Sequence, residues 1–147
     1  MCLLIKRKFK SEKTALAFFD KPSVATKNIT VYKVLVVQKY TFDIRSPYKY
    51  TLYHPGKLSS VFGFSYSKNS LKRDKQLSIE CGIHSFVKRK DAQKTADMFE
   101  KCFVTKCVIP KGTKYFLGVY GDDEIIPNYV SLALQMPKVI DASKANF

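Results

Sequence analysis

The sequence predicts one α+β domain, with one principal helix and a short N-terminal helix against small mixed or antiparallel sheets. The length of 147 residues matches the commonest size of a single domain. Hydrophobic residues make up 46% of the chain and aromatic residues 14%, enough to build a core. Short β-branched and aromatic runs recur along the chain, and one longer stretch has apolar residues at helical spacing. One principal helix with several strands is the pattern of an α+β fold.

Residues 1–28 are expected to form a basic lead-in that precedes the domain. Ser11 is suited to cap a short helix that runs to Phe19, and Pro22 follows as a helix breaker. The polar stretch 21–28 is typical of a linker. The domain is therefore expected to span residues 29–137, with residues 138–147 as a loose C-terminal tail.

The segment 30–38 predicts a central strand. It is rich in β-branched residues and almost continuously apolar, as in a strand that is buried on both faces. Residues 40–44 alternate between apolar and polar side chains, which predicts a strand with one face open to water. Ser46 and Pro47 end that pattern.

The middle of the chain is expected to contain less regular structure. Residues 48–53 follow as a further candidate strand, and residues 54–57 contain the Pro-Gly pair of a turn. Residues 58–77 are rich in Ser and Lys, which predicts a long surface excursion. Long loops within compact domains are often functional.

The C-terminal half contains the principal helix. Residues 78–86 predict a strand, and Asp91 is suited to cap a helix on which Ala92, Ala96 and Phe99 share one face with Phe103. The remaining strands are expected at residues 104–109, 113–119, 124–126 and 130–134.

The strongest global signal is positive charge. The chain carries 26 Lys and Arg against 12 Asp and Glu, a formal net charge of +14. Such a field attracts nucleic acid, nucleotides, anionic lipids or acidic protein surfaces, although solvated surface lysines are the alternative interpretation. Lys outnumbers Arg, and Lys is less suited to bidentate recognition. Three separate clusters contain much of the charge: Lys6, Arg7, Lys8 and Lys10; Lys68, Lys72, Arg73 and Lys75; Lys88, Arg89, Lys90 and Lys94.

The cysteines and histidines predict neither a metal site nor a catalytic centre. Four cysteines lie at spacings that match no zinc or disulfide framework, and there are only two histidines. The motifs of phosphate loops, serine hydrolases, zinc proteases and EF-hands are missing. No apolar run of 18 residues and no signal-peptide core occur, so an intracellular, reducing compartment is expected. We therefore predict no cofactor and no membrane span, and a non-enzymatic role is favoured.

The segment 82–86 is the first candidate site. His84 and Ser85 are expected where a strand leads into the principal helix, beside helix N–H groups that suit an anion or a nucleotide phosphate. The following basic cluster would add positive charge. The alternative is that His84 is a buried core histidine.

Two further segments offer ligand contacts. Ser46 and Tyr48 belong to a tyrosine-rich stretch that could stack a base and bond a ribose, although tyrosines also occur at the rims of sheets. Lys111 and Tyr115 lie in a segment that predicts a hairpin turn first and an anion contact second.

The chain resembles a family of small, mostly uncharacterised proteins from bacteriophages and large DNA viruses. Members open with Met-Cys-Leu, as at residues 1–3, and continue with a strand like residues 29–34 and a Ser-Pro-Tyr element like residues 46–48. Gly-Ile-His-Ser-Phe and Cys-x-Ile-Pro-Lys-Gly-Thr-Lys-Tyr blocks match residues 82–86 and 107–115. This resemblance covers about residues 29–135. It implies a viral accessory protein in the cytoplasm of an infected host cell, and no settled activity.

The order of elements also resembles ADP-ribosyltransferase-like folds, in which NAD lies in a cleft between two small sheets. That resemblance implies that Lys33 of a Tyr32–Lys33 pair, His84, Ser85 and Glu124 face a ligand. The basic residue of the first strand is Lys here, and the usual His-Tyr-Glu set cannot be placed. The resemblance thus implies ligand binding more than catalysis.

The leading prediction is a non-enzymatic viral protein that binds an anionic nucleotide-like ligand, for example a host immune signal that it sequesters. The alternative is a basic structural or interaction protein that docks on nucleic acid or on an acidic virion or host surface. An ADP-ribosyltransferase-like enzyme is the third hypothesis. Convergence of Tyr32, Tyr48, His84 and Lys111 on one cavity would favour the ligand, and dispersal would favour docking. The predicted ligand-binding residues are Tyr32, Lys33, Ser46, Tyr48, His84, Ser85, Lys111 and Tyr115, with no catalytic residue and no metal ligand.

Overall fold

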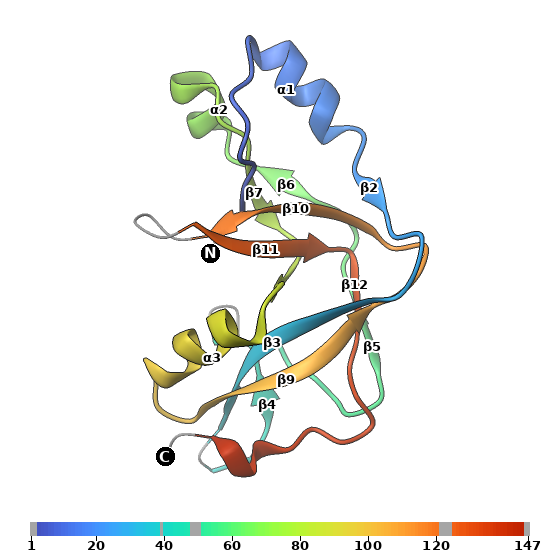
Figure 1. The fold of residues 1–147 in the computed structure, drawn as a ribbon, viewed down its shortest axis with the longest axis vertical. Coiled ribbons are helices and arrows are strands. Elements are labelled where there is room, and N and C mark those ends of the chain that lie inside the picture. The colour runs from blue at the N-terminus through green and yellow to red at the C-terminus, as the bar shows by residue number, and fades with distance from the viewer. Residues whose placement is uncertain (1–2, 39, 48–50, 121–124, 146–147) are drawn as a thin grey trace.

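The computed structural model describes residues 3–38, 40–47, 51–120 and 125–145, and it confirms the α+β fold. Within those residues, three α-helices accompany a sheet of 12 antiparallel strands that curls into a half-barrel (Figure 1). No helix of the described residues is both long enough and apolar enough to cross a bilayer.

The strands follow one another along the chain with few helices between them. The helices are α1 (Glu12–Phe19), α2 (Lys68–Asp74) and α3 (Arg89–Asp97), with a 3₁₀ turn, η1 (Ala142–Lys144), near the C-terminus. The strands are β1 (Leu3–Leu4), β2 (Ser23–Val24), β3 (Ile29–Val37), β4 (Ile44–Arg45), β5 (Leu58–Ser60), β6 (Ser65–Tyr66), β7 (Ser78–Cys81), β8 (Ile83–Phe86), β9 (Cys102–Ile109), β10 (Lys114–Tyr120), β11 (Ile126–Ser131) and β12 (Ala133–Gln135).

The molecule has two halves that share the curled sheet (Figure 1). One half contains β3, β4, β5, β9 and β12 with α3, and the other contains β1, β2, β6, β7, β10 and β11 with α1 and α2. Strand β8 joins them, because it pairs with β11 on one side and with β3 on the other.

Strand β3 is central, as its sequence predicts. It pairs with β9 from Ile29 to Val36 and is buried on both faces. Val31 and Leu35 pack into the core on one face, whereas Val34 packs on the opposite face beneath α3, with Ala92 and Ala96. Continuous β-branched and aliphatic residues suit this environment because neither face of the strand is open to water.

Gly82 makes the corner at which β7 becomes β8. The sequence predicts one strand over residues 78–86, but the backbone turns at Gly82, which has a φ of +136°. Strand β7 then pairs with β1, whereas β8 pairs with β11. A Cβ at Gly82 would overlap the Val130 side chain. Only glycine therefore provides both the backbone conformation and the space.

The N-terminal segment is part of the same sheet. Strand β1 lies between β10 and β7, and β2 pairs with β10. Leu3, Phe9 and Ala15 are buried in a core cluster with Phe116 of β10. Helix α1 begins as predicted, since the Ser11 Oγ accepts a hydrogen bond from the Thr14 N–H at 3.2 Å. Residues 3–28 thus pack into the domain that this segment was expected to precede.

The predicted surface excursion at residues 58–77 is wrong. This segment contains β5, β6 and α2, and its Leu71 and Leu77 are buried. Two isolated leucines among polar residues are enough to anchor the segment, because each buries a full side chain in the core. The turn at residues 54–57 is confirmed by the hydrogen bond from the Lys57 N–H to the His54 carbonyl.

Three other expectations need correction. Residues 40–43 form a turn with Phe42 at a φ of 58° and exposed, and only β4 follows as a strand. Of the candidate strand 48–53, residues 48–50 lie outside the described residues, and Leu52 forms a single bridge to Arg45. Lys88, and not Asp91, precedes the first turn of α3.

The end of α3 and the C-terminal tail also differ from expectation. The helix buries Ala92 and Ala96 as predicted but ends at Asp97, so Phe99 lies beyond it and Phe103 belongs to β9. In the tail, Ile140 packs with η1 against the core.

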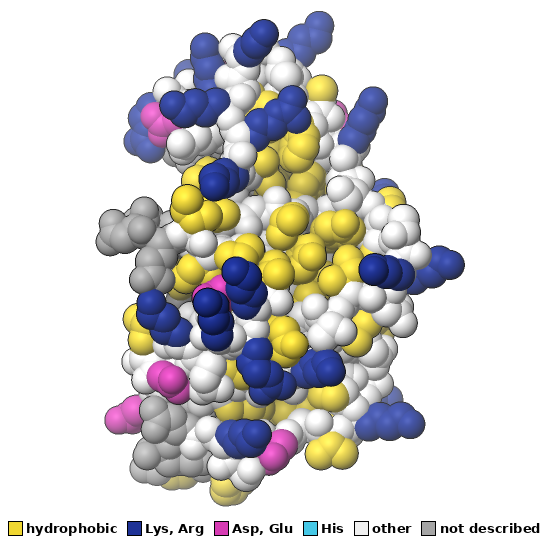
Figure 2. All heavy atoms as spheres, viewed as in Figure 1, with side chains coloured by type: hydrophobic (Ala, Val, Ile, Leu, Met, Phe, Trp, Pro, Cys, Tyr) yellow, Lys and Arg dark blue, Asp and Glu magenta, His cyan; other side chains and the backbone are white. Residues whose placement is uncertain are grey.

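The fold brings two of the three basic clusters to one end of the molecule. Residues 6–10 precede α1, and residues 68–75 form α2 and its C-terminal flank. Helices α1 and α2 pack against each other, and Lys and Arg side chains surround this end (Figure 2). The third cluster lies along α3, from Lys88 before its first turn to Lys94 in its last turn, in the other half.

We predict that Gly82→Ala lowers the free energy of unfolding by about 2–5 kcal/mol. The substitution combines strain at a positive φ with overpacking against Val130, and each effect costs about 1–3 kcal/mol. Urea denaturation measures the change. Gly63→Ala is the matched control, because a Cβ there meets nothing within 4 Å. Equal stability of the two variants would contradict the assignment of Gly82 as an obligatory corner.

Candidate ligand-binding site

The candidate site lies where the pairing between β3 and β8 stops. The two strands share one pair of residues, Tyr32 with Phe86, and β3 then continues to Val37 beside β4. Near this point the Lys33 Nζ donates a hydrogen bond to the His84 carbonyl at 2.6 Å. A side-chain amine thus bonds a backbone carbonyl next to the end of the ladder, as expected for a buried polar backbone group.

A cavity of about 340 Å³ opens at this position. It is lined by side chains of β3 and β8, by the β4–β5 and β5–β6 connections, and by the end of α3. Four of the lining residues are aromatic: Tyr53, Phe62, Phe86 and Phe99. Clefts that combine apolar walls with a few convergent polar groups are typical of small-molecule sites.

Lys33 supplies the charge of this cavity. The residue is only 8% exposed, although it occupies the same face of β3 as the core residues Val31 and Leu35. Its Nζ lies 5.8 Å from the centre of the Tyr53 ring, within range of a cation–π interaction. Burial of an ammonium group costs several kcal/mol. No Asp or Glu is among the described residues that line the cavity.

His84 also lines the cavity, but it does not lie at a helix start. It is 7% exposed and sits in β8 opposite Val130, whereas α3 begins only at Arg89. The predicted anion site at fresh helix N–H groups is therefore wrong, because β8 continues to Phe86 before the chain turns into the helix. The alternative of a buried histidine describes its position.

Ser85 lies on β8 opposite Tyr129 and does not line the cavity. It is 1% exposed, and its Oγ has no hydrogen-bond partner among the described residues. Ser85 is therefore placed outside the cavity that His84 lines.

Hydroxyl groups supply the other polar atoms of the cavity wall. One of them, the Ser46 Oγ, accepts a hydrogen bond from the Thr51 N–H at 3.0 Å, which fixes the loop after β4. The other lining residues with hydroxyl groups are Thr51, Tyr53, Ser59, Ser60 and Thr95. These groups can both donate and accept hydrogen bonds, as a ligand with a sugar or an anionic group requires.

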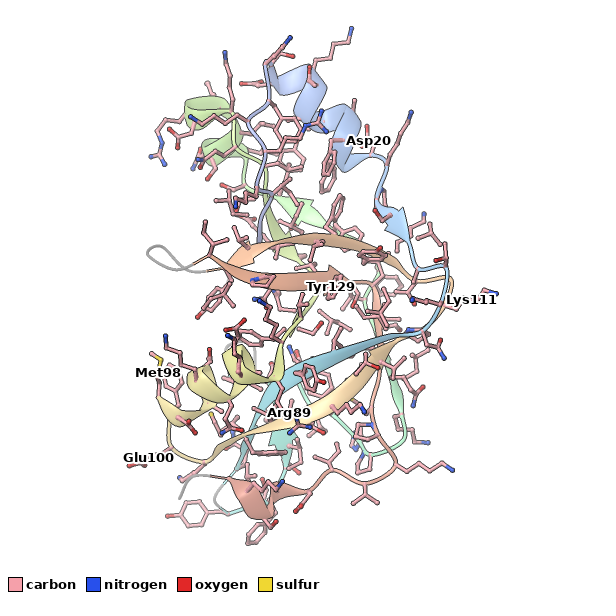
Figure 3. All side chains as sticks on the ribbon, in the orientation of Figure 1. Asp20, Arg89, Met98, Glu100, Lys111 and Tyr129 are labelled. Atoms are coloured by element: carbon pink, nitrogen blue, oxygen red, sulfur yellow. The ribbon has the colours of Figure 1, made fainter. Side chains whose placement is uncertain are left out.

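The remaining predicted residues lie elsewhere. Tyr32 is on the opposite face of β3, where the Arg89 guanidinium lies 5.2 Å from its ring centre. Tyr115 packs against Tyr129 with a ring separation of 5.5 Å. Lys111 lies at the β9–β10 turn and points away from the molecule (Figure 3), and its N–H donates to the Asn28 Oδ1.

The structure thus brings Lys33, Ser46 and His84 together at one cavity and places Tyr32, Ser85, Lys111 and Tyr115 outside it. Tyr48 and Glu124 lie outside the described residues. Of the four residues whose convergence was the criterion, His84 alone is described as lining the cavity, whereas Tyr32 and Lys111 are dispersed. By that criterion these four residues favour docking, and support for a ligand has to come from the other residues that line the cavity.

Sequence reasoning missed the aromatic wall. Phe62 and Phe99 line the cavity but are largely exposed, Phe62 fully and Phe99 at 43%. Phe62 belongs to the segment that was predicted to be a surface excursion, and Phe99 was assigned to the buried face of the helix. The one available signal was the Val61-Phe62-Gly63 run, which is apolar within a polar stretch.

Burial changes the acidity of two groups close to Lys33. Desolvation raises the pKa of Tyr53 to about 12, with a further contribution from Cys107. Desolvation also raises the pKa of Cys107 to about 12, and the positive charge of Lys33 opposes this shift without overcoming it. Cys107 is therefore a neutral, buried thiol. Cys81 is exposed and lines the cavity.

The described side chains form no group of three or more His, Cys, Asp or Glu that could hold a metal ion. Comparisons with protein-family models, with curated proteins and with solved structures found no match for this chain.

We predict that the protein loses stability as the pH rises from 9 to 12. The unfolded forms ionise at the ordinary pKa values of 9.0 for Cys107 and 10.0 for Tyr53, whereas the folded forms ionise near 12. The stabilisation is complete below pH 9 and is lost as the pH approaches 12. Each pKa unit corresponds to about 1.4 kcal/mol, so the total fall is on the order of a few kcal/mol.

Urea denaturation at several pH values tests this expectation. Tyr53→Phe should make the fall between pH 10 and 12 shallower, because phenylalanine has no proton to lose. Tyr40→Phe is the control, since Tyr40 is 87% exposed. An unchanged pH dependence in Tyr53→Phe would show that this phenol does not couple to folding.

Proposed function

We propose that this protein binds a small anionic, nucleotide-like molecule in the cavity beside β3 and β8. The observation that supports this most is the buried Lys33 amine, in a cavity with aromatic walls and no carboxylate among its described lining residues. Burial of a cation in a core position costs stability. An anionic group of the ligand would interact favourably with the Lys33 ammonium.

The aromatic rings suit the base of such a ligand. Phe62 and Phe99 present large apolar faces to solvent at the cavity, where a flat aromatic ligand would cover them. Stacking on an aromatic side chain contributes about 1–3 kcal/mol per base and tolerates different bases. Ser59 and Ser60 lie in the same wall and offer hydroxyl groups to a sugar.

The size of the cavity favours a mononucleotide over a dinucleotide. Ligand pockets usually span about 300–1,000 Å³, and 340 Å³ is near the lower limit. A linear or cyclic mononucleotide fits this volume better than NAD. This argues for a ligand smaller than the one implied by the ADP-ribosyltransferase-like resemblance.

Binding of this kind requires affinity and no chemical step. A viral accessory protein that sequesters a host immune signal would need a closed pocket with a charge to hold the ligand. Lys33 and His84 provide polar groups for the anionic part of the ligand, and the aromatic wall provides an apolar surface for its base.

We predict that Lys33→Met weakens nucleotide binding by about ten- to a hundred-fold. A hydrogen bond to a charged group contributes about 1.5–3 kcal/mol, which corresponds to this range of affinity. Stability should change little or fall modestly, because methionine removes a buried charge but leaves the His84 carbonyl without its hydrogen bond from Lys33. Isothermal titration with AMP, cyclic AMP, cyclic GMP, ADP-ribose and NAD measures binding, and urea denaturation measures stability.

Lys106→Met is the matched control, because Lys106 is an exposed residue of the neighbouring strand β9. It should leave both quantities unchanged. Alkylation of Cys81, followed by peptide mapping, gives a second readout, since a ligand in the cavity would shield this thiol. No heat with any of the five probes at micromolar protein, or full affinity in Lys33→Met, would overturn the proposal.

We predict that His84→Ala lowers the melting temperature by several degrees as well as weakening binding. Its imidazole is buried, so truncation leaves a hole and removes packing contacts. A loss of about 2 kcal/mol shifts the melting temperature of a chain of this size by about 4–8 °C. Scanning calorimetry and titration on the same variant separate the two effects. Reduced stability with unchanged affinity would remove His84 from the site.

A further inference from the structure

One end of the molecule concentrates positive charge more than the rest of the chain does. We define the basic pole as residues 6–21, which include α1, together with residues 68–75, which include α2. These 24 residues contain ten Lys or Arg and three Asp or Glu, a net charge of +7. This is half of the net charge of +14 on about one sixth of the chain.

Packing between α1 and α2 creates the basic pole. Phe9, Ala15 and Leu71 are buried together in one core cluster, which fixes the two segments against each other. The ten basic side chains are left exposed on the outside. On the face shown in Figure 2, Lys and Arg side chains gather at the end of the molecule that carries the two helices. The basic pole is therefore a product of the fold, since the two segments lie far apart in the sequence.

The acidic residues of the basic pole cannot neutralise it. The ion pair between the Arg73 Nε and the Asp74 carboxylate, at 3.1 Å, uses one of the three carboxylates. Even if each carboxylate paired with a cation, seven positive charges would remain. A surface with this excess raises the local concentration of polyanions and speeds their association.

The types of side chain in the basic pole indicate which class of polyanion it would bind. Among its residues, all of which are described, none of the large hydrophobic side chains is exposed. Insertion into a membrane surface requires an exposed apolar face, and single-stranded nucleic acid requires exposed aromatic rings for stacking. The Leu16, Phe18 and Phe19 side chains of the basic pole are partly buried, so it offers only limited apolar and aromatic surface.

Lysine side chains of this kind suit a regular array of phosphates. Eight of the ten cations are lysines, which act as mobile point charges and do not read base edges in the way that a fixed Arg fork does. The Arg7 guanidinium is held over the rings of Phe9 and Phe18, 5.3 and 5.6 Å from their centres. We propose that the basic pole binds the phosphate backbone of double-helical nucleic acid without sequence preference.

Fluorescence anisotropy with a labelled 20-base-pair duplex, in DNA and RNA forms, tests this proposal between 50 and 200 mM salt. Affinity should fall steeply with salt, because each phosphate contact releases counterions. The triple variant Lys10→Gln, Lys13→Gln, Lys72→Gln should bind at least tenfold more weakly at 50 mM salt. Its log–log salt slope should be smaller by about 2–3, since each lost contact removes about 0.9 from the slope.

The control removes the same charge from the other half of the molecule. Lys57→Gln, Lys106→Gln, Lys138→Gln changes three exposed lysines outside the basic pole and should reduce affinity less than threefold. Comparison of the DNA and RNA duplexes shows whether the protein binds both with equal affinity. Nucleotide titration should be the same in both triple variants, so failure of this proposal is distinguishable from failure of the cavity site.

Three results would overturn the proposal. The first is no binding to either duplex at 50 mM salt, and the second is an equal loss in the two triple variants. The third is tighter binding to a single strand of the same length or to vesicles rich in phosphatidylserine, which would assign the basic pole to a different partner.

Discussion

The architecture depends on the corner at Gly82. Because the backbone turns there at a positive φ, one continuous stretch of chain supplies β7 to one side of the curled sheet and β8 to the other. Strands β11, β10 and β1 lie between β8 and β7 in the sheet. The same corner limits the contact of β8 with β3 to one residue pair, and the cavity opens where that pairing ends. A local conformational requirement thus decides both the shape of the sheet and the position of the candidate site.

The core around this cavity combines stabilising and destabilising elements. Val31, Leu35 and Phe103 bury their side chains almost completely on the face of the sheet where Lys33 is placed. These apolar groups offset the cost of desolvating an ammonium ion. The raised pKa values of Tyr53 and Cys107 report the same dry environment. An anion that enters such a medium interacts more strongly with Lys33 than it would in water, since the screening is weaker.

Local signals in the sequence predicted much of the fold. Examples are the β-branched run of β3, the Ser11 cap of α1 and the alanines of α3. Each of these patterns depends only on residues close together in the sequence, so it can be recognised without a structure. The segments whose structure was predicted wrongly depend on contacts with residues far away in the sequence. Leu71 and Leu77 look like isolated residues in a polar loop until the N-terminal segment supplies the surface that buries them.

The site was less predictable than the fold for the same reason. The residue types of Lys33, Ser46 and His84 mark each of them as a candidate. They come from β3, from the loop after β4 and from β8, and only the fold shows that they line one cavity. Which side of a strand each residue faces depends on register, so Tyr32 and Ser85 could not be separated from their neighbours without the strand pairing. Phe62 had only the short apolar run Val61-Phe62-Gly63 to mark it, and such a run within a polar segment does not show which cavity its side chains line.

The interior position of β1 has a consequence for the order in which the molecule can assemble. Leu4 pairs with Val119 on one side and with Ser78 on the other, so the first strand cannot be completed until most of the polypeptide is available. Contacts between residues so distant along the chain slow folding, because a long loop must close before they form. During synthesis on the ribosome, Leu3, Leu4 and Ile5 would emerge before their partner strands β7 and β10, with their apolar side chains unprotected. A chaperone that binds short hydrophobic segments would find a site there.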